Sequence, residues 1–282
     1  MAAGSAETAV LAPSAANVRR VVPGRYGGMA AGSYAFEGDL RDLPPDMPWH
    51  SHDLHQLEYA FEGVVLLETA VARYRLPPRQ AVWIPAGLAH KSTFAAAKTV
   101  SVFFEPSLVH DRAGRARVLP VEPVLREMMI YALRWRIDRT SSDPVADSYF
   151  ETLAHLVSDG LRYELPFYLP TSTDPLVAAV MRHTDDHLDT VDLRQVCEAV
   201  RVSERTLRRR FHASTGMTWR QYALHSRILH AMTLLVDQEA TITSVATAVG
   251  FDSASAFSRA FQSYTGRTPT AFRQNRDPAT ST

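Results

Sequence analysis

Apolar and polar positions follow two different periods along this chain. From about Tyr34 to Glu105, short strand-like apolar runs are separated by turn residues such as Gly63, Pro85 and Gly87. Many short runs in succession are typical of a β-barrel or β-sandwich. From Glu122 onward apolar residues recur three and four positions apart, which indicates amphipathic helices. The pattern predicts a mixed fold, with an all-β N-terminal part followed by helices.

Two helical patterns directly follow the strands. The segments EPVLREMMIYALRWRI and DSYFETLAHLVSDGLRYEL each have one apolar face, on which a partner subunit could pair. The stretch FYLPTSTDP, with Pro170 and Pro175 around Thr and Ser residues, is the best candidate for a linker. Everything after this linker has a helical pattern.

Length and composition limit the class of protein. A chain of 282 residues suggests about two domains. No apolar run approaches the roughly 18 residues that a membrane helix needs. The start MAAGSAETAVLAPSAAN lacks the basic and apolar regions of a signal peptide, so we predict a cytoplasmic protein. The single cysteine, Cys197, has no partner for an internal disulfide and is expected to be a small core residue.

Positive charge is concentrated locally, although the formal net charge is zero. The stretch from Arg201 to Arg227 holds seven arginines against one acid, Glu204. An arginine cluster in an otherwise balanced chain points to a nucleic-acid partner, because the guanidinium binds phosphate and guanine edges in a bidentate manner.

The C-terminal region contains the same helical pattern twice. In the first copy a helix face ending near Val200 is followed by a break and by the helix ERTLRRRFHAS, in which Leu207 and Phe211 face the core. About fifty residues later a face ending at Val249 is followed by SASAFSRAF. A continuous helix over Trp219–Val236, about 27 Å long at 1.5 Å per residue, is predicted between them. The spacing fits two helices that enter neighbouring major grooves on one side of a DNA duplex.

Residues 192–273 resemble the DNA-binding domain of the AraC/XylS family of bacterial transcription regulators. The resemblance rests on residues in the family's order and spacing: Leu193, Ser203, Leu207, Arg209, Phe211, Gly216, Arg227, Ala231, Leu234, Leu235, Ile242, Ala246, Gly250, Phe251, Phe257, Arg259, Phe261, Gly266, Pro269 and Arg273. It implies two helix-turn-helix units whose second helices read DNA. By position, the implied DNA contacts are Arg205, Arg208, Arg209, Ser255, Ser258 and Arg259.

Three positions depart from the family pattern. Arg201 stands where the family has a turn glycine, so it either carries a left-handed backbone cost or shifts the turn slightly. Cys197 stands where the family has alanine. Ala254 occupies a usual contact position of the second reading helix and offers only a methyl group, which predicts weaker base recognition there.

A group of histidines marks the N-terminal part. The segments WHSHDLHQLEYAFEG and WIPAGLAH resemble the two cupin motifs, which implies a jelly-roll sensor barrel of the kind found in many AraC-family proteins. Carried over by position, the metal-ligand places fall on His50, His52, Gln56 and His90. Gln56 stands where metal cupins have Glu, but Glu58 shares its strand face and is a candidate for the missing anionic oxygen. Three imidazoles and a carboxylate would suit Zn, Fe, Mn or Ni.

Other interpretations of the histidines stay open. The same side chains can line a metal-free pocket for an organic effector or satisfy one another by hydrogen bonds. A cupin metalloenzyme, such as a dioxygenase or isomerase with a fused DNA-binding domain, is the alternative from another functional class. It would leave the tandem helical units without a role, and the chain lacks the sequence motifs of a Ser/His/Asp nucleophile or a phosphate loop.

These observations together predict a ligand-responsive, non-enzymatic transcription regulator. We expect a barrel that senses a metal or small molecule, double-stranded DNA as the main partner, and no membrane. The resemblance also implies a homodimer and contact with RNA polymerase. The expected boundaries are a disordered leader at 1–20, the cupin-like barrel at 21–120, a helical dimerisation segment at 121–168, a linker at 169–175 and the DNA-binding domain at 176–276.

Overall fold

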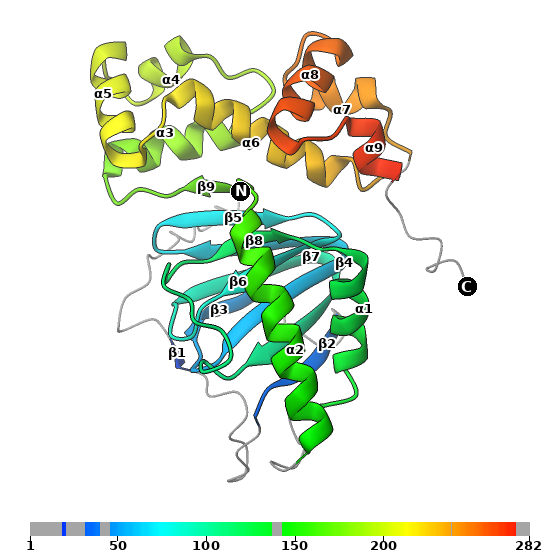
Figure 1. Cartoon of the computed structure of the whole chain (residues 1–282). Coiled ribbons are helices and arrows are strands. Elements are labelled where there is room, and N and C mark those ends of the chain that lie inside the picture. Colours follow the sequence, from blue (N-terminus) through cyan, green and yellow to red (C-terminus); the bar gives the residue numbers. More distant parts are fainter. Residues whose placement is uncertain (1–18, 21–31, 40–45, 137–142, 238, 275–282) are drawn as a thin grey trace, which may run out of the picture.

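The computed structural model describes residues 19–20, 32–39, 46–136, 143–237 and 239–274. These residues form an N-terminal sheet domain and a C-terminal helical domain, which lie one above the other (Figure 1). The expected leader at 1–20 lies outside the described residues, apart from Arg19 and Arg20.

The N-terminal domain is built on one sheet of nine strands. Its path runs β1-β3-β7-β4-β5-β9, with β2 added to β7, β6 added to β4 and β8 added to β6. The strands are β1 (Arg19–Arg20), β2 (Tyr34–Asp39), β3 (Asp46–Ser51), β4 (His55–Thr69), β5 (Ala72–Leu76), β6 (Gln80–Ile84), β7 (His90–Phe104), β8 (Arg117–Pro120) and β9 (Tyr168–Pro170).

Two long strands organise this sheet. β4 and β7 have 15 residues each and pair with one another along most of their length. β4 also pairs with β6 over Gln56–Tyr59 and with β5 over Val65–Glu68, so its two halves have different outer neighbours. The expected all-β N-terminal part is therefore confirmed. The expected jelly-roll barrel is not a closed ring in the described part of the chain, where the strand path ends at β1 and β9 without joining them.

Two helices cover part of the sheet (Figure 1). They are α1 (Pro123–Ala132) and α2 (Pro144–Gly160), and α2 is followed by a short 3-10 helix, η2 (Leu161–Tyr163). Phe150 of α2 packs against Phe104 of β7 inside a buried apolar cluster. Asp143 caps α2 by accepting hydrogen bonds from the backbone N–H groups of Val145 and Ala146.

The segment after η2 crosses to the helical domain. The linker was expected at 169–175, but Tyr168–Pro170 form β9, which pairs antiparallel with β5. Asp174 then caps α3, whose first residue is Pro175. Backbone hydrogen bonds to β5 and to the Val71 carbonyl thus bind the first part of this segment to the sheet.

The helical domain repeats a two-helix unit. Its elements are α3 (Pro175–Asp186), α4 (Leu193–Ala199), α5 (Glu204–Thr215), α6 (Trp219–Leu234), α7 (Ile242–Ala248), α8 (Ala254–Thr265) and α9 (Pro269–Gln274). The pairs α4–α5 and α7–α8 are the two units, and α6 runs between them (Figure 1). The connecting helix was expected over Trp219–Val236, and α6 ends two residues earlier, at Leu234.

Serine caps start both second helices. Ser203 accepts a hydrogen bond from the Thr206 N–H at the start of α5, and Ser253 accepts one from the Ala256 N–H at the start of α8. The turns before them differ. Arg201 has a φ of 55°, so of the two alternatives expected at this position the structure has the left-handed backbone, whereas the second turn has Gly250 with a φ of 78°.

Gly250 also touches the first unit. A Cβ atom added to Gly250 would lie 2.3 Å from the carbonyl oxygen of Asp189, in the loop between α3 and α4. Arg227 of α6 reaches the same loop and donates hydrogen bonds to the carbonyl oxygens of Leu188 and Val191. The two helix-turn-helix units are therefore joined by close backbone contact as well as by α6.

Within the described ranges, none of the helices combines the length and the hydropathy that a membrane-spanning segment requires.

We expect Gly250→Ala to lower the free energy of unfolding of the helical domain by about 2–4 kcal/mol. A left-handed alanine costs about 1–2 kcal/mol, and the displaced Asp189 carbonyl adds a steric cost of similar size. Gly216→Ala is the control, because its φ is 73° but nothing lies within 4 Å of the added Cβ. Urea denaturation of both variants checks this, and equal losses would show that the approach to Asp189 has no energetic weight.

Candidate DNA interface and histidine site

The first candidate reading helix, α5, has one buried side and one exposed side. Leu207 and Phe211 are fully buried, four residues apart, and fix the orientation of the helix. The predicted contact residues Arg205, Arg208 and Arg209 are all exposed. The structure thus brings these three arginines to one solvent-facing surface.

Ion pairs distinguish the arginines of α5. Arg208 pairs with Glu204 at 2.7 Å, one turn earlier on the same helix. Arg210 makes a bidentate contact with Asp174, and this hydrogen bonding lowers the pKa of that carboxyl. Among the described residues, Arg205 and Arg209 have no hydrogen-bond or ion-pair partner. Their guanidinium groups are therefore the most available to an external anion.

Arg227 does not belong to this surface. The sequence places it at the end of the arginine-rich stretch, but its side chain is half-buried and donates to backbone carbonyls of the loop after α3. A local charge count cannot separate such a structural arginine from a surface one.

The second candidate reading helix, α8, is less charged. Phe257 and Phe261 are fully buried, Ser255 and Arg259 are exposed, and Ser258 is half-buried. Ala254, the first residue of α8, is also half-buried. Arg259 is the one cation among the three predicted contacts of this helix, so α8 offers much less positive charge than α5.

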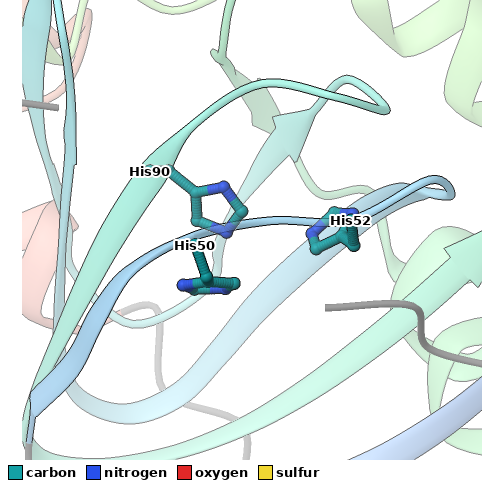
Figure 2. A group of neighbouring side chains, drawn as sticks. All are labelled: His50, His52 and His90. Carbon is teal, nitrogen blue, oxygen red and sulfur yellow. The ribbon is translucent and has the colours of Figure 1, made fainter. Parts of the chain in front are cut away.

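The sheet domain brings three predicted histidines together. His50 lies on β3, His52 just after it, and His90 is the first residue of β7, directly paired with His50. All three are buried, and one ring nitrogen from each lies within 4.8 Å of the others. Figure 2 shows the three rings gathered between two neighbouring segments of the chain.

Backbone carbonyls fix the proton positions on these rings. The Nδ1 atoms of His50, His52 and His90 lie 2.9, 2.6 and 2.9 Å from the carbonyl oxygens of Pro48, Leu54 and Leu88, respectively. A carbonyl oxygen only accepts hydrogen bonds, so Nδ1 carries the proton in His50 and His90 and their Nε2 lone pairs are left for other partners. His52 faces an acceptor oxygen at both nitrogens, the Leu54 carbonyl at Nδ1 and Gln56 Oε1 at Nε2, and a neutral ring can donate to only one of them.

Burial also keeps these rings uncharged. It lowers the pKa of His50 and His52 and places the pKa of His90 well below its ordinary value. The mutual repulsion of the rings lowers the pKa of His90 further. Neutral imidazole with a free Nε2 is the form that binds a divalent metal.

Gln56 and Glu58 continue the site along β4. The Oε1 atom of Gln56, an acceptor, lies 2.9 Å from His52 Nε2, and the Nε2 atom of Gln56 donates to Glu58 Oε2 at 2.8 Å. Gln56 thus stands between the histidines and Glu58. Burial raises the pKa of Glu58, and its Oε1 is buried with no hydrogen-bond partner in the described part of the chain.

Ser101 is a member of this group that the sequence analysis missed. Its hydroxyl donates to Glu58 Oε2, and it also accepts a hydrogen bond from Gln56. Ser101 lies on β7 directly opposite Glu58 in the strand register. Only knowledge of the β4–β7 pairing brings these two residues together, because they are 43 positions apart in the chain.

Comparison with known proteins finds sequence similarity to helix-turn-helix proteins. Residues 196–275 match the family model of a helix-turn-helix domain. NimR, an HTH-type transcriptional regulator of Escherichia coli (strain K12), is 28% identical over 224 residues, which are 79% of this chain and 80% of NimR. RhaR, an HTH-type transcriptional activator of the same strain, is 34% identical over 113 residues, 40% of each chain.

A solved structure with a similar chain has a lower sequence identity than these two relatives. ToxT from Vibrio cholerae O395 has 12% sequence identity and a TM-score of 0.37, over 87% of this chain and 98% of ToxT. The matched domain model runs from within α4 to the end of α9. This chain carries a helix-turn-helix domain and is similar to HTH-type transcriptional regulators.

Proposed function

We propose that the protein is a transcription regulator that binds double-stranded DNA through α5 and α8 and responds to an effector in its sheet domain. The observation that carries the proposal is the tandem of reading helices, each fixed by two buried residues and each with its polar side exposed. Its relatives NimR and RhaR are HTH-type regulators, which supports the same function here.

The two reading helices contribute unequally to this proposed function. Arg205 and Arg209 on α5 combine exposure with the absence of a partner among the described residues. An arginine of this kind binds guanine in the major groove or a backbone phosphate. α8 offers Ser255, Ser258 and Arg259, so α5 supplies most of the affinity.

A divalent metal is the effector that best fits the histidine site. The Nδ1 atom of each imidazole lies at hydrogen-bond distance from a backbone carbonyl, which is the arrangement that orients metal-binding histidines in proteins. An ion bound to His52 Nε2 would replace the contact of that atom with Gln56 Oε1. His50, His52 and His90 would hold the ion, with Gln56 beside them. Three neutral nitrogen ligands favour Zn²⁺, Fe²⁺, Mn²⁺ or Ni²⁺ over Ca²⁺ and Mg²⁺.

A small organic effector is the second candidate for the same site. The buried Oε1 of Glu58 has no hydrogen-bond partner in the described ranges. A hydroxyl or amine of a ligand would satisfy it. In this case the histidines would serve as hydrogen-bond partners of the ligand, and metal would be absent from the active regulator.

The proposed partners extend to a second copy and to RNA polymerase. α1 and α2 carry exposed apolar side chains, among them Val124, Tyr131 and Val145. Exposed apolar groups on adjacent helices favour subunit pairing. This supports, for residues 121–168, the dimerisation role that the sequence suggests.

We expect Arg209→Ala to weaken binding to the DNA upstream of the protein's own gene by about 1–3 kcal/mol, because a base or phosphate contact is lost. Fluorescence anisotropy at several salt concentrations measures the dissociation constant. Arg162→Ala is the matched control, since Arg162 is 77% exposed and lies in the sheet domain. An equal affinity of both variants would refute the assigned role of Arg209, and salt-independent binding would refute the DNA interface.

We expect untagged protein, purified without chelator, to contain about one equivalent of a transition metal by elemental analysis. His52→Ala should lose this metal, because it removes one of three converging nitrogen ligands. His110→Ala, at an exposed position, is the control. Metal-free wild-type protein that stays metal-free after reconstitution would exclude the metal and leave the organic effector.

A further inference from the structure

The sheet domain and the helical domain are joined along one hairpin. β9 extends the sheet at β5, with Ala72 opposite Pro170 and Tyr74 opposite Tyr168. Just beyond β9, the Thr171 N–H donates to the carbonyl of Val71 at 2.9 Å, and its hydroxyl donates to the carbonyl of Ala70 at 2.8 Å. The β4–β5 turn thus holds the start of the segment that leads into α3.

A partly buried carboxylate lies beside this hairpin. Arg73 of β5 pairs with Asp185 of α3 at 2.6 Å, and the two side chains are 36% and 22% exposed. Tyr222 and Ser226 of α6 also donate hydrogen bonds to Asp185, at 3.1 and 2.9 Å. The Asp185 carboxylate therefore gathers donors from two elements, β5 of the sheet and α6, the helix that connects the two reading units.

The arrangement around Asp185 depends on all its donors. A carboxylate that loses a charged partner in a partly buried place keeps its desolvation cost, so removal of Arg73 favours separation of the two surfaces. The neighbouring Arg75 adds a single hydrogen bond to Thr233 of α6, at 3.1 Å. These contacts cross between the domains and are made by the same short hairpin.

The turn of the β4–β5 hairpin lies next to one residue of the histidine site. His90 is opposite Thr69 in the β4–β7 register. The Thr69 hydroxyl closes the turn by donating to the Ala72 carbonyl and accepting from the Ala72 N–H. His90 pairs with Thr69, and Thr69 holds the turn that binds Thr171. A shift of His90 can therefore reach this turn through a single pair of residues.

We propose that Thr171, Arg73 and Asp185 form an interdomain latch, and that its opening and closing transmits the state of the histidine site to the DNA-binding domain. The proposal rests on the proposed function for its regulatory role. An effector acts through such an element only when it binds the closed and open states with different affinity, and the effect on DNA binding is then reciprocal.

Hydrogen exchange on the full chain tests the latch without an effector. We expect peptides covering 168–173 to exchange at least 10-fold faster in Arg73→Met and in Asp185→Asn than in wild type, and Arg73→Lys to retain most of the protection. Arg115→Met is the matched control, because Arg115 makes a similar 2.6 Å ion pair with Glu164 that does not reach the helical domain. Peptides from β4 and β7 report whether each variant is folded.

DNA binding tests the regulatory role. The ratio of dissociation constants for upstream DNA, measured with Zn²⁺-loaded and chelator-treated protein, should fall to within two-fold of one in Arg73→Met and stay at the wild-type value in Arg115→Met. Unchanged exchange in both latch variants, or a Zn²⁺ response that survives in them, would overturn the latch. A wild-type ratio of one would refute zinc sensing by the proposed regulator, and the exchange result would still decide whether the latch exists.

Discussion

Burial of apolar surface continues without a break from the sheet into the helix-turn-helix units, and the arrangement of the whole molecule depends on this. A single buried cluster includes Leu67 and Leu76 of the sheet, Leu169 of β9, and Phe211 and Phe261 of the two reading helices. Phe167, just before β9, also belongs to this cluster, and Tyr168 packs against it. Because apolar burial is the dominant stabilising term, the two domains share stability along this line.

Sequence periodicity was sufficient for the local structure of the helical domain. The apolar spacing around Leu207 and Phe211 predicted the buried side of α5, and the left-handed backbone at Arg201 is one of the two alternatives that the sequence left open. The three histidines followed from the resemblance to the cupin motifs. Residues whose role comes from tertiary contact could not be identified from the sequence. Arg227 was counted with the surface arginines, and no sequence motif marked Ser101. Nothing in the sequence distinguished Asp185 from the other acidic residues, of which the chain has 30 in all.

The predicted linker is a second case in which tertiary contact, and not local composition, decides the structure. Pro170 and the Thr and Ser residues after it have the composition of a loop, but a free edge at β5 turns Tyr168–Pro170 into a strand. A proline is compatible with an edge strand, because it gives up only a donor that the outer side of the sheet does not need. The sheet is open at β5, and the predicted linker forms β9 because it pairs with this open edge. The chain thereby covers an edge of its own sheet.

The close approach of Gly250 to Asp189 has a consequence for the DNA that this protein can use. α6 has 16 residues, about 24 Å at 1.5 Å per residue, and the turn of the second unit at Gly250 also packs closely against the loop before α4. We therefore expect the two reading helices to keep one separation and one angle. Each inserted base pair rotates the duplex by about 34° and lengthens it by about 3.4 Å, so operators of this protein should vary in sequence between the two recognised segments but not in the number of base pairs.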